Sequence, residues 1–246
     1  MQVTTAQRWV RRWDAQQERY IPDREERFRV VIDVVRAAVG TGPARVVDLG
    51  CGPGSLSARI AAALPQVDVV GVDADPLLLG LGAANTGPRV KLIEADLCYP
   101  SWPDRTGLAG PWDAAVSSTA LHWLDPDSLA ALYRTLAERL RPGGVFVNAD
   151  QMGLGASTLD AIAGAVREAR TARVGTDRNE DWAEWWQALR EDAELTPLLD
   201  GRDHSTSHTE NDLTVHQQAA LLRAAGFAEA GPVWQFGDDH VLVAVR

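Results

Sequence analysis

The stretch Val46-Val-Asp-Leu-Gly-Cys-Gly-Pro-Gly54 decides the expected fold, because it reads as a short apolar strand that runs into a glycine-rich turn. After the turn, Leu56, Ile60 and Leu64 recur at a spacing of four and form one apolar stripe, as in a helix packed on a sheet. Glycines let the backbone pass close under a ligand, and the start of the next helix offers unpaired N–H groups. The sequence therefore predicts a ligand site at the end of a buried strand.

Short apolar runs alternate with helical periodicity as far as Asp150, which is the pattern of βαβ units in a parallel sheet. The last two apolar runs are joined through Gly237-Asp-Asp239, and so short a connection requires an antiparallel hairpin. We therefore expect five parallel strands followed by an antiparallel pair. The predicted strands cover residues 46–49, 69–72, 90–94, 114–117, 145–149, 233–236 and 241–245.

The alternation stops after Asp150, where a segment rich in Ala, Arg, Trp and acidic residues follows. The length of the chain suits one α/β domain with an insertion. We interpret it as a single domain with four parts: a helical lid (1–40), a core (41–150), a small helical cap or substrate insertion (151–212), and a last helix with the hairpin (213–246). Helices are predicted at 126–140, 157–173, 181–194 and 214–226, the last opened by a capping box.

Composition limits the classes of function. Of the 246 residues 46% are hydrophobic and 24% charged, and no apolar run reaches the roughly 18 residues that a membrane span needs. The first residues lack the apolar stretch of a signal peptide, and Cys51 and Cys98 are the only cysteines, so we expect a cytoplasmic protein without disulfides. We interpret Cys51 as a small spacer in the loop. The net charge of -10 argues against a nucleic-acid partner.

Acidic residues accompany the glycine turn. Asp48 lies inside the motif, where it can attract an ammonium group, and Asp73 ends the second predicted strand, where a carboxylate can accept both hydroxyls of a ribose. Asp96, just after the third strand, can accept from an exocyclic adenine amine, and Leu97 can pack beside the ring. The glycine spacing G-x-G-x-G differs from the dinucleotide pattern G-x-G-x-x-G, which disfavours an NAD-dependent oxidoreductase without removing it as an alternative.

In order and spacing, these elements resemble class I S-adenosylmethionine-dependent methyltransferases over roughly residues 40–150 and the final hairpin. The resemblance implies an α/β fold: a Rossmann-like, seven-stranded, mostly parallel sheet with an antiparallel last strand and helices on both faces. It also implies S-adenosylmethionine as the cofactor and S-adenosylhomocysteine as its product. Ala120-Leu-His-Trp123, after the fourth strand, is similar to the trans-aconitate methyltransferase branch and its small-molecule relatives, although the cap departs from that branch.

The resemblance also suggests roles for single residues. The glycine motif with Asp48 would hold the methionine moiety, Asp73 the ribose, and Asp96 with Leu97 the adenine. The segment after the fourth strand would form the wall beside the sulfonium, and Tyr20 would cover the cofactor unless its helix merely packs on the sheet edge. The residues assigned to the cofactor are Asp48, Gly50, Gly52, Gly54, Asp73, Ala74, Asp96, Leu97, Ser117 and Tyr20.

Two histidines are candidate catalytic bases, His122 after the fourth strand and His208 in the polar loop before the last helix. A base is needed only where the acceptor is protonated at the working pH, and a neutral imidazole suits that task. His122 can instead be a packing or cofactor-contact residue. His204, His208 and His216 alternate with acidic residues, but their spacing fits no common closed metal site, so we expect no metal.

The tryptophans of the cap, Trp182, Trp185 and Trp186, share one face of a helix, which either lines a pocket for a flat or apolar substrate or packs on the core. We expect a small-molecule acceptor, in O-, N- or C-methylation and possible natural-product metabolism, with no nucleic acid or membrane partner, in a monomer or homodimer. The alternative is a protein that binds S-adenosylmethionine on the same fold without transferring its methyl group, as a non-methylating enzyme or a partner subunit.

Overall fold

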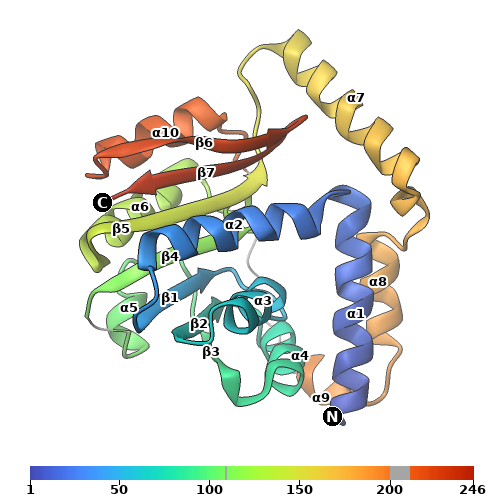
Figure 1. Ribbon diagram of the computed structural model, residues 1–246. Helices are drawn as coiled ribbons and strands as arrows, with labels where there is room; N and C mark the ends of the chain where they lie inside the picture. The colour runs from blue at the N-terminus through green and yellow to red at the C-terminus, as the bar shows by residue number, and fades with distance from the viewer. Residues whose placement is uncertain (109, 200–210) are drawn as a thin grey trace.

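A seven-stranded sheet forms the centre of the protein, which is seen here in a computed structural model that describes residues 1–108, 110–199 and 211–246 (Figure 1). The strand order is β3-β2-β1-β4-β5-β7-β6. Among the described strands, β7 alone runs in the direction opposite to the others. The expected fold class is therefore confirmed. The strands are β1 (Ala44–Leu49), β2 (Val67–Asp73), β3 (Val90–Glu94), β4 (Trp112–Ser118), β5 (Leu140–Gln151), β6 (Glu229–Phe236) and β7 (Asp239–Val245).

Helices cover both faces of the sheet because successive strand residues point to opposite sides. Val46 packs into the apolar core beneath two of the helices, α2 and α3, whereas its neighbour Val47 packs into the core beneath α6 and α10. The helices are α1 (Val3–Tyr20), α2 (Arg24–Val39), α3 (Ser55–Ala63), α4 (Pro76–Thr86), α5 (Trp102–Arg105), α6 (Pro126–Arg139), α7 (Ser157–Val174), α8 (Trp182–Arg190), α9 (Thr196–Leu199) and α10 (Val215–Ala224), with 3₁₀ turns η1 (Gly87–Arg89), η2 (Leu121–Trp123) and η3 (Thr176–Arg178).

Side-chain caps start several of these helices where the sequence indicates. Asp75 accepts a hydrogen bond from the backbone N–H of Leu77 at 2.9 Å, and Asp125 accepts from that of Asp127 at 3.0 Å. A proline follows each capping aspartate at the first helical position. At α10 the predicted capping box between Thr214 and Gln217 is present.

The helix predicted at 126–140 and the strand predicted at 145–149 leave residues 141–144 as a turn between them, and this expectation is wrong. These residues belong to β5, which begins at Leu140 and is longer than expected. Arg141 holds this part of the strand against β4, since its Nε donates to a carboxylate oxygen of Asp113 at 2.6 Å. The second predicted helix of the cap is also shorter than expected: α8 ends at Arg190, and α9 follows after a turn.

Helices α1 and α8 lie side by side across the carboxyl ends of the parallel strands (Figure 1). Their contact is aromatic: the Trp9 ring meets Trp185 at 5.6 Å between centroids, and Trp13 meets Trp182 at 5.3 Å. Both helices share a core cluster with the apolar face of α4. The pair therefore closes the space above the strand ends.

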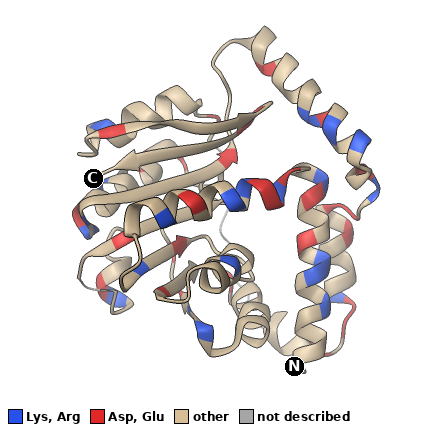
Figure 2. Ribbon diagram, in the orientation of Figure 1, with Lys and Arg blue, Asp and Glu red and all other residues tan. Residues whose placement is uncertain are grey.

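Charged residues lie mainly on the helices, and most residues of the sheet are uncharged (Figure 2). Ion pairs tie the N-terminal segment to the segment after β5, among them one between Arg8 and Asp192 at 2.6 Å. Arg12 lies 2.6 Å from Glu180, and Arg170 lies 2.7 Å from Asp23. None of the described helices combines the length and the apolar character that crossing a membrane requires.

Candidate active site

A cavity of about 630 Å³ lies between the strand ends and the α1–α8 pair. The sheet order brings the residues that follow β3, β2, β1, β4 and β5 to one edge, which is where α/β sheets bind ligands. The volume is within the range of small-molecule sites, roughly 300–1,000 Å³. The predicted site residues that line this cavity are Tyr20, Gly50, Gly52, Asp73, Ala74, Asp96, Leu97 and His122.

The turn after β1 needs glycine for two reasons, a positive φ and, at Gly50, the lack of space for a side chain. Gly50 has φ +65°, and a Cβ added there would stand 2.4 Å from the Cβ of Ala120. Gly52 has φ +54° and lines the cavity. Gly54, at φ +75°, is the residue from which α3 starts; it shapes the turn and lines neither this cavity nor the smaller one beside it.

Asp73 connects the end of β2 to this glycine turn. One carboxylate oxygen accepts from the backbone N–H of Gly52 at 2.7 Å, and the other accepts from that of Asp75 at 2.8 Å. Burial raises the pKa of Asp73, and the hydrogen bonds from the backbone oppose that rise. A carboxylate has about four acceptor positions, so two remain for hydroxyl groups of a ligand.

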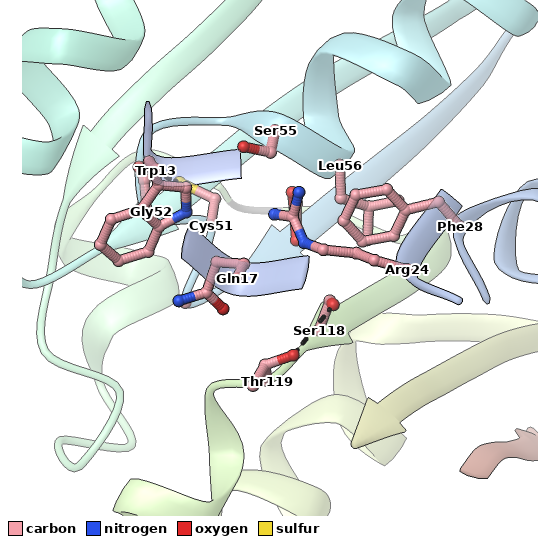
Figure 3. A pocket seen from close by; sticks show the side chains of 12 residues that line it. Trp13, Gln17, Arg24, Phe28, Cys51, Gly52, Ser55, Leu56, Ser118 and Thr119 are labelled. Atoms are coloured by element: carbon pink, nitrogen blue, oxygen red, sulfur yellow. Dashed lines mark hydrogen bonds between the residues drawn. The ribbon is translucent and has the colours of Figure 1, made fainter. Parts of the chain in front are cut away.

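A smaller cavity of about 50 Å³ adjoins the glycine turn and is lined by side chains of opposite charge (Figure 3). Asp48 is 1% exposed and accepts from the hydroxyl of Ser57 at 2.6 Å; burial raises its pKa to about 7. Arg24 comes from the start of α2 and pairs with Asp14 at 2.8 Å, and burial lowers its pKa. A buried carboxylate and a guanidinium in one small cavity suit the two charged groups of an amino acid.

The residues predicted to contact the adenine and to cover the cofactor also line the large cavity. Asp96 follows β3 and accepts from the backbone N–H of Cys98 at 2.8 Å, so its side chain is held at the cavity wall beside Leu97. The hydroxyl of Tyr20 accepts from the backbone N–H of Trp182 at 3.2 Å. Tyr20 therefore joins the lid helix to the cap at the edge of the cavity.

The structure does not bring Ser117 into the site. Its side chain is fully buried and donates to the carbonyl of Leu49 at 2.8 Å, because β4 extends one residue further than expected and turns Ser117 into the sheet layer. The next two residues, Ser118 and Thr119, line the smaller cavity instead. Thr119 has φ +55°, a conformation that costs an L-residue free energy and is frequent at functional sites.

A fully buried arginine holds this strained wall. Arg27, from α2, donates to the hydroxyl of Ser118 at 2.9 Å and to that of Thr119, and it pairs with Asp239 at 2.7 Å. Asp239 begins β7. The start of β7 and the cavity wall are therefore linked through one guanidinium, which sequence reasoning did not single out.

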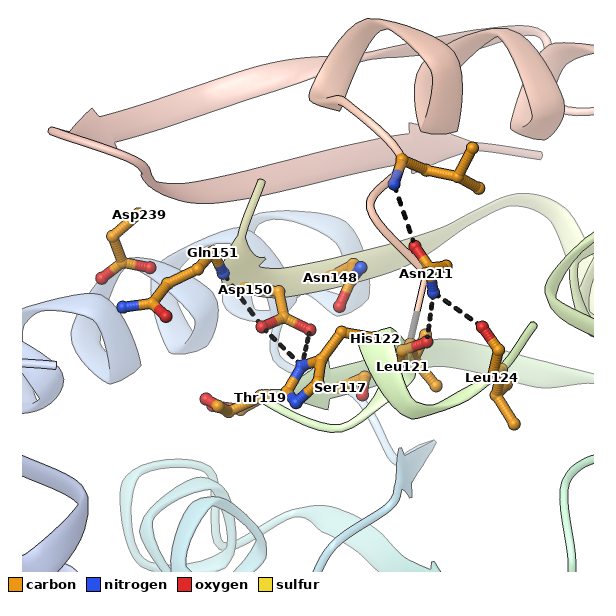
Figure 4. Close-up of polar contacts among 12 residues, drawn as sticks. Ser117, Thr119, Leu121, His122, Leu124, Asn148, Asp150, Gln151, Asn211 and Asp239 are labelled. Atoms are coloured by element: carbon orange, nitrogen blue, oxygen red, sulfur yellow. Dashed lines mark hydrogen bonds and ion pairs between the residues drawn. The ribbon is translucent and has the colours of Figure 1, made fainter. Parts of the chain in front are cut away.

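His122 lines the large cavity from η2 and is paired with Asp150 at the end of β5 (Figure 4). Its Nδ1 lies 3.1 and 3.0 Å from the two carboxylate oxygens of Asp150. Asp150 is 2% exposed and also accepts from the backbone N–H of Gln151 at 2.9 Å. In the neutral imidazole this pairing favours the proton on Nδ1, which leaves the lone pair on Nε2.

An asparagine fixes the turn that carries this histidine. The Nδ2 of Asn211 donates to the carbonyls of Leu121 and Leu124 at 3.0 and 2.8 Å (Figure 4). The backbone N–H of Asn211 donates to the carbonyl of His122 at 2.8 Å. These contacts hold the orientation of η2. Sequence reasoning missed Asn211, because a single polar residue before a helix carries no signal of a long-range contact.

The second candidate base, His208, lies outside the described residues, as does His204. His216 is an exposed residue of α10. Across residues 1–108, 110–199 and 211–246, no three His, Cys, Asp or Glu side chains are grouped so as to hold a metal ion.

The cap tryptophans divide between the two roles that the sequence leaves open. Trp185 is fully buried and belongs to the core cluster. Trp182 is 39% exposed and lines the cavity, and Trp186 does both, since it is nearly buried yet lines the cavity.

Comparison with known proteins agrees with this architecture. Residues 46–144 match a family model described as a methyltransferase domain. The match covers less than half of the chain, and together with the seven-stranded fold it is consistent with a methyltransferase domain of the class I family. S-adenosylmethionine is the cofactor that this family indicates.

Several curated relatives share one name. The chain is 38% identical over 133 residues to the trans-aconitate 2-methyltransferase of Azoarcus sp. (strain BH72). This match covers 54% of this chain and 48% of the relative. It is 39% identical over 102 residues to the Deinococcus radiodurans protein of the same name, covering 42% of this chain and 36% of the relative. The matches thus span about half or less of these relatives' length.

Solved structures support the fold. The magnesium protoporphyrin IX methyltransferase of Synechocystis PCC 6803 superposes with a TM-score of 0.57 at 17% identity, covering 94% of this chain and 86% of that one. An O-methyltransferase family protein from Burkholderia thailandensis gives 0.55 at 18%, covering 89% and 55%. At these identities the likeness concerns the fold alone.

Proposed function

We propose that this chain binds S-adenosylmethionine over the glycine turn and transfers its methyl group to a small-molecule acceptor. The observation that carries the proposal is that one cavity edge joins three elements: the glycine turn, the carboxylates that follow β2 and β3, and the His122–Asp150 pair. The first two suit a nucleoside cofactor. The third suits removal of a proton from an acceptor.

The residues present fit the cofactor. Its amino-acid end carries an ammonium and a carboxylate, which match Asp48 and Arg24 in the smaller cavity. Asp73 has acceptor positions left for the ribose hydroxyls, and Asp96 with Leu97 offers an acceptor and an apolar contact for the adenine. Gly50 is the residue type that fits here, because any side chain at this position would collide with Ala120.

When bound, the cofactor supplies a methyl group already activated on a sulfonium. The chain then has three tasks: to hold the acceptor in line, to exclude water and to accept a proton where the acceptor carries one. We assign the last task to His122 through Nε2, with Asp150 as a positioning residue that fixes the ring. Acceptors with a hydroxyl, an amine or an acidic carbon can all give a proton to His122. The type of methylation (O, N or C) and a place in natural-product metabolism stay predictions.

Calorimetric titration of S-adenosylmethionine and S-adenosylhomocysteine tests the cofactor site. We expect micromolar dissociation constants, lost in Asp73→Ala and unchanged in Asp68→Ala, an exposed aspartate on the same strand. No binding by the folded wild-type protein would overturn the proposal.

An assay of methyl transfer then tests the reaction itself, with trans-aconitate, the compound in the relatives' name, among the acceptors. If the protein binds the cofactor but methylates no small molecule from a broad panel, the non-methylating alternative replaces this proposal.

A further inference from the structure

Aromatic side chains form much of the large cavity wall. Trp13 and Tyr20 come from α1, Trp182 and Trp186 from α8, and Trp123 from η2. Trp13 and Trp186 each meet the Trp182 ring, at 5.3 and 5.7 Å between centroids. These four residues of α1 and α8 are called the aromatic wall below.

Two of the cavity tryptophans keep large exposed faces. Trp182 and Trp123 are each 39% exposed, whereas Trp185, one residue from the aromatic wall, is fully buried. An exposed indole face is costly to keep in water, and it stabilises a ligand that covers it. Both residues line the large cavity.

The charges of the cavity favour some ligands over others. Among the described lining residues the formally charged side chains are the carboxylates of Asp73, Asp75 and Asp96. Asp73 and Asp96 are assigned to the cofactor, so they do not set the charge that the acceptor meets. The described lining residues include no lysine or arginine, so none of them would form an ion pair with a carboxylate of the acceptor. The aromatic wall gives a cation a further favourable contact.

We propose that the acceptor is a planar aromatic compound without carboxylate groups, which packs on Trp182 and Trp123 with its methyl-accepting atom toward His122. This inference rests on the proposed function and names the substrate class of the same site. It makes the tryptophans specificity residues. His122 and Asp150 act on the proton, and the carboxylates at the ends of β2 and β3 hold the cofactor.

Binding to the complex with S-adenosylhomocysteine tests the inference without a known substrate. The probes are 2-naphthol, a neutral planar phenol, and citrate, a tricarboxylate, each titrated calorimetrically into the saturated complex. We expect 2-naphthol to bind and citrate not to bind. Trp182→Ala should weaken 2-naphthol binding about tenfold, the size of one lost aromatic contact with its buried area. Trp182→Phe should restore most of that loss.

Trp234→Ala is the matched control, since Trp234 is a partly exposed tryptophan on β6 that does not line either cavity. It should change 2-naphthol binding less than twofold. The affinity for S-adenosylhomocysteine should stay within twofold of wild type in all three variants.

Other outcomes overturn the inference in distinct ways. If citrate binds and 2-naphthol does not, the acceptor class is wrong while the proposed function stands. If Trp182→Ala weakens S-adenosylhomocysteine instead of 2-naphthol, the aromatic wall belongs to the cofactor. If the folded wild-type protein does not bind S-adenosylhomocysteine, the proposed function fails and the inference falls with it.

Discussion

His122 and Asp150 are hydrogen-bonded across the ends of β4 and β5, with Nδ1 at 3.0 Å from the nearer carboxylate oxygen. The two residues are 28 positions apart in sequence, and the parallel pairing of the two strands brings them together. Asp150 is buried while the histidine ring reaches the cavity. The carboxylate can therefore orient the ring without itself contacting a ligand.

This pairing predicts the effect of removing either partner. His122→Ala should lower the single-turnover rate about 10²- to 10⁴-fold, the range for loss of a general base, while the dissociation constant for S-adenosylmethionine stays within twofold. Asp150→Asn should also lower the rate, because an amide N–H facing Nδ1 favours the tautomer that has its proton on Nε2. Rapid-quench measurements with saturating acceptor would give these rates.

His216→Ala is the matched control, since that histidine is exposed on α10 and should leave the rate unchanged. A loss of cofactor affinity in His122→Ala with an unchanged rate would instead make His122 a contact residue of the cofactor.

Asp48 makes stability depend on pH in a defined direction. Burial raises its pKa from 3.8 to about 7, so between these pH values the folded protein holds a proton that the unfolded chain has lost. The free energy of unfolding of the ligand-free protein should therefore fall as pH rises through this window. Asp48→Asn removes the effect. At pH 8 the variant should be more stable than wild type by about 2–4 kcal/mol, and below pH 4 the two should agree.

Urea unfolding at several pH values would measure this difference. A difference that does not change with pH would show that Asp48 does not titrate in this window. The same variant should bind S-adenosylmethionine more weakly, since an amide cannot compensate an ammonium charge.

The sheet and the cofactor edge were predictable from the sequence because both depend on local patterns. β-Branched runs such as 69–72 mark buried strands, and glycines followed by an apolar helix mark the turn. Asp73 and Asp96 could be assigned since the first is the last residue of β2 and the second lies two residues beyond β3. Their distances from the glycine turn follow from parallel pairing alone.

The rest of the site depends on contacts that no local pattern contains. Arg24 and Arg27 stand three residues apart on α2, yet one faces a cavity and the other pairs with Asp239 on β7. Asp150 is the second-last residue of β5, so the strand-end rule that selected Asp73 also applies to it. Its partner was not predictable, because the distance to His122 depends on how η2 folds back.

The close approach of Gly50 to Ala120 predicts that a second substitution restores cofactor binding lost through a first. Gly50→Ala would add a Cβ 2.4 Å from that of Ala120, in a residue with φ +65°, and should weaken S-adenosylmethionine binding more than tenfold. Adding Ala120→Gly removes the collision and should recover part of the affinity, although the strain from φ remains. Calorimetry on the single and double variants would measure both effects.

Gly87→Ala separates the strain from the collision. Gly87 has φ +59° with nothing near its added Cβ, so it should cost about 1 kcal/mol of stability and leave cofactor binding unchanged. Equal losses of affinity in Gly50→Ala and Gly87→Ala would mean that the contact with Ala120 does not matter.

The buried pair of Arg27 and Asp239 predicts a large loss of stability when one partner is removed. Arg27→Met leaves a carboxylate that is 4% exposed without its guanidinium, and should lower the free energy of unfolding by about 3–5 kcal/mol. It also removes the donors to Ser118 and Thr119, so S-adenosylmethionine should bind more weakly as the wall of the smaller cavity relaxes.

Arg29→Met is the matched control on the same helix, because Arg29 makes an exposed pair with Glu26 and should change stability by no more than about 0.5 kcal/mol. The double variant Arg27→Met with Asp239→Leu replaces both charges and should recover part of the stability lost by Arg27→Met. It should not recover cofactor affinity, since neither new side chain can donate to Thr119. Recovery of both would show that the guanidinium serves only to neutralise Asp239 and does not hold the cavity wall.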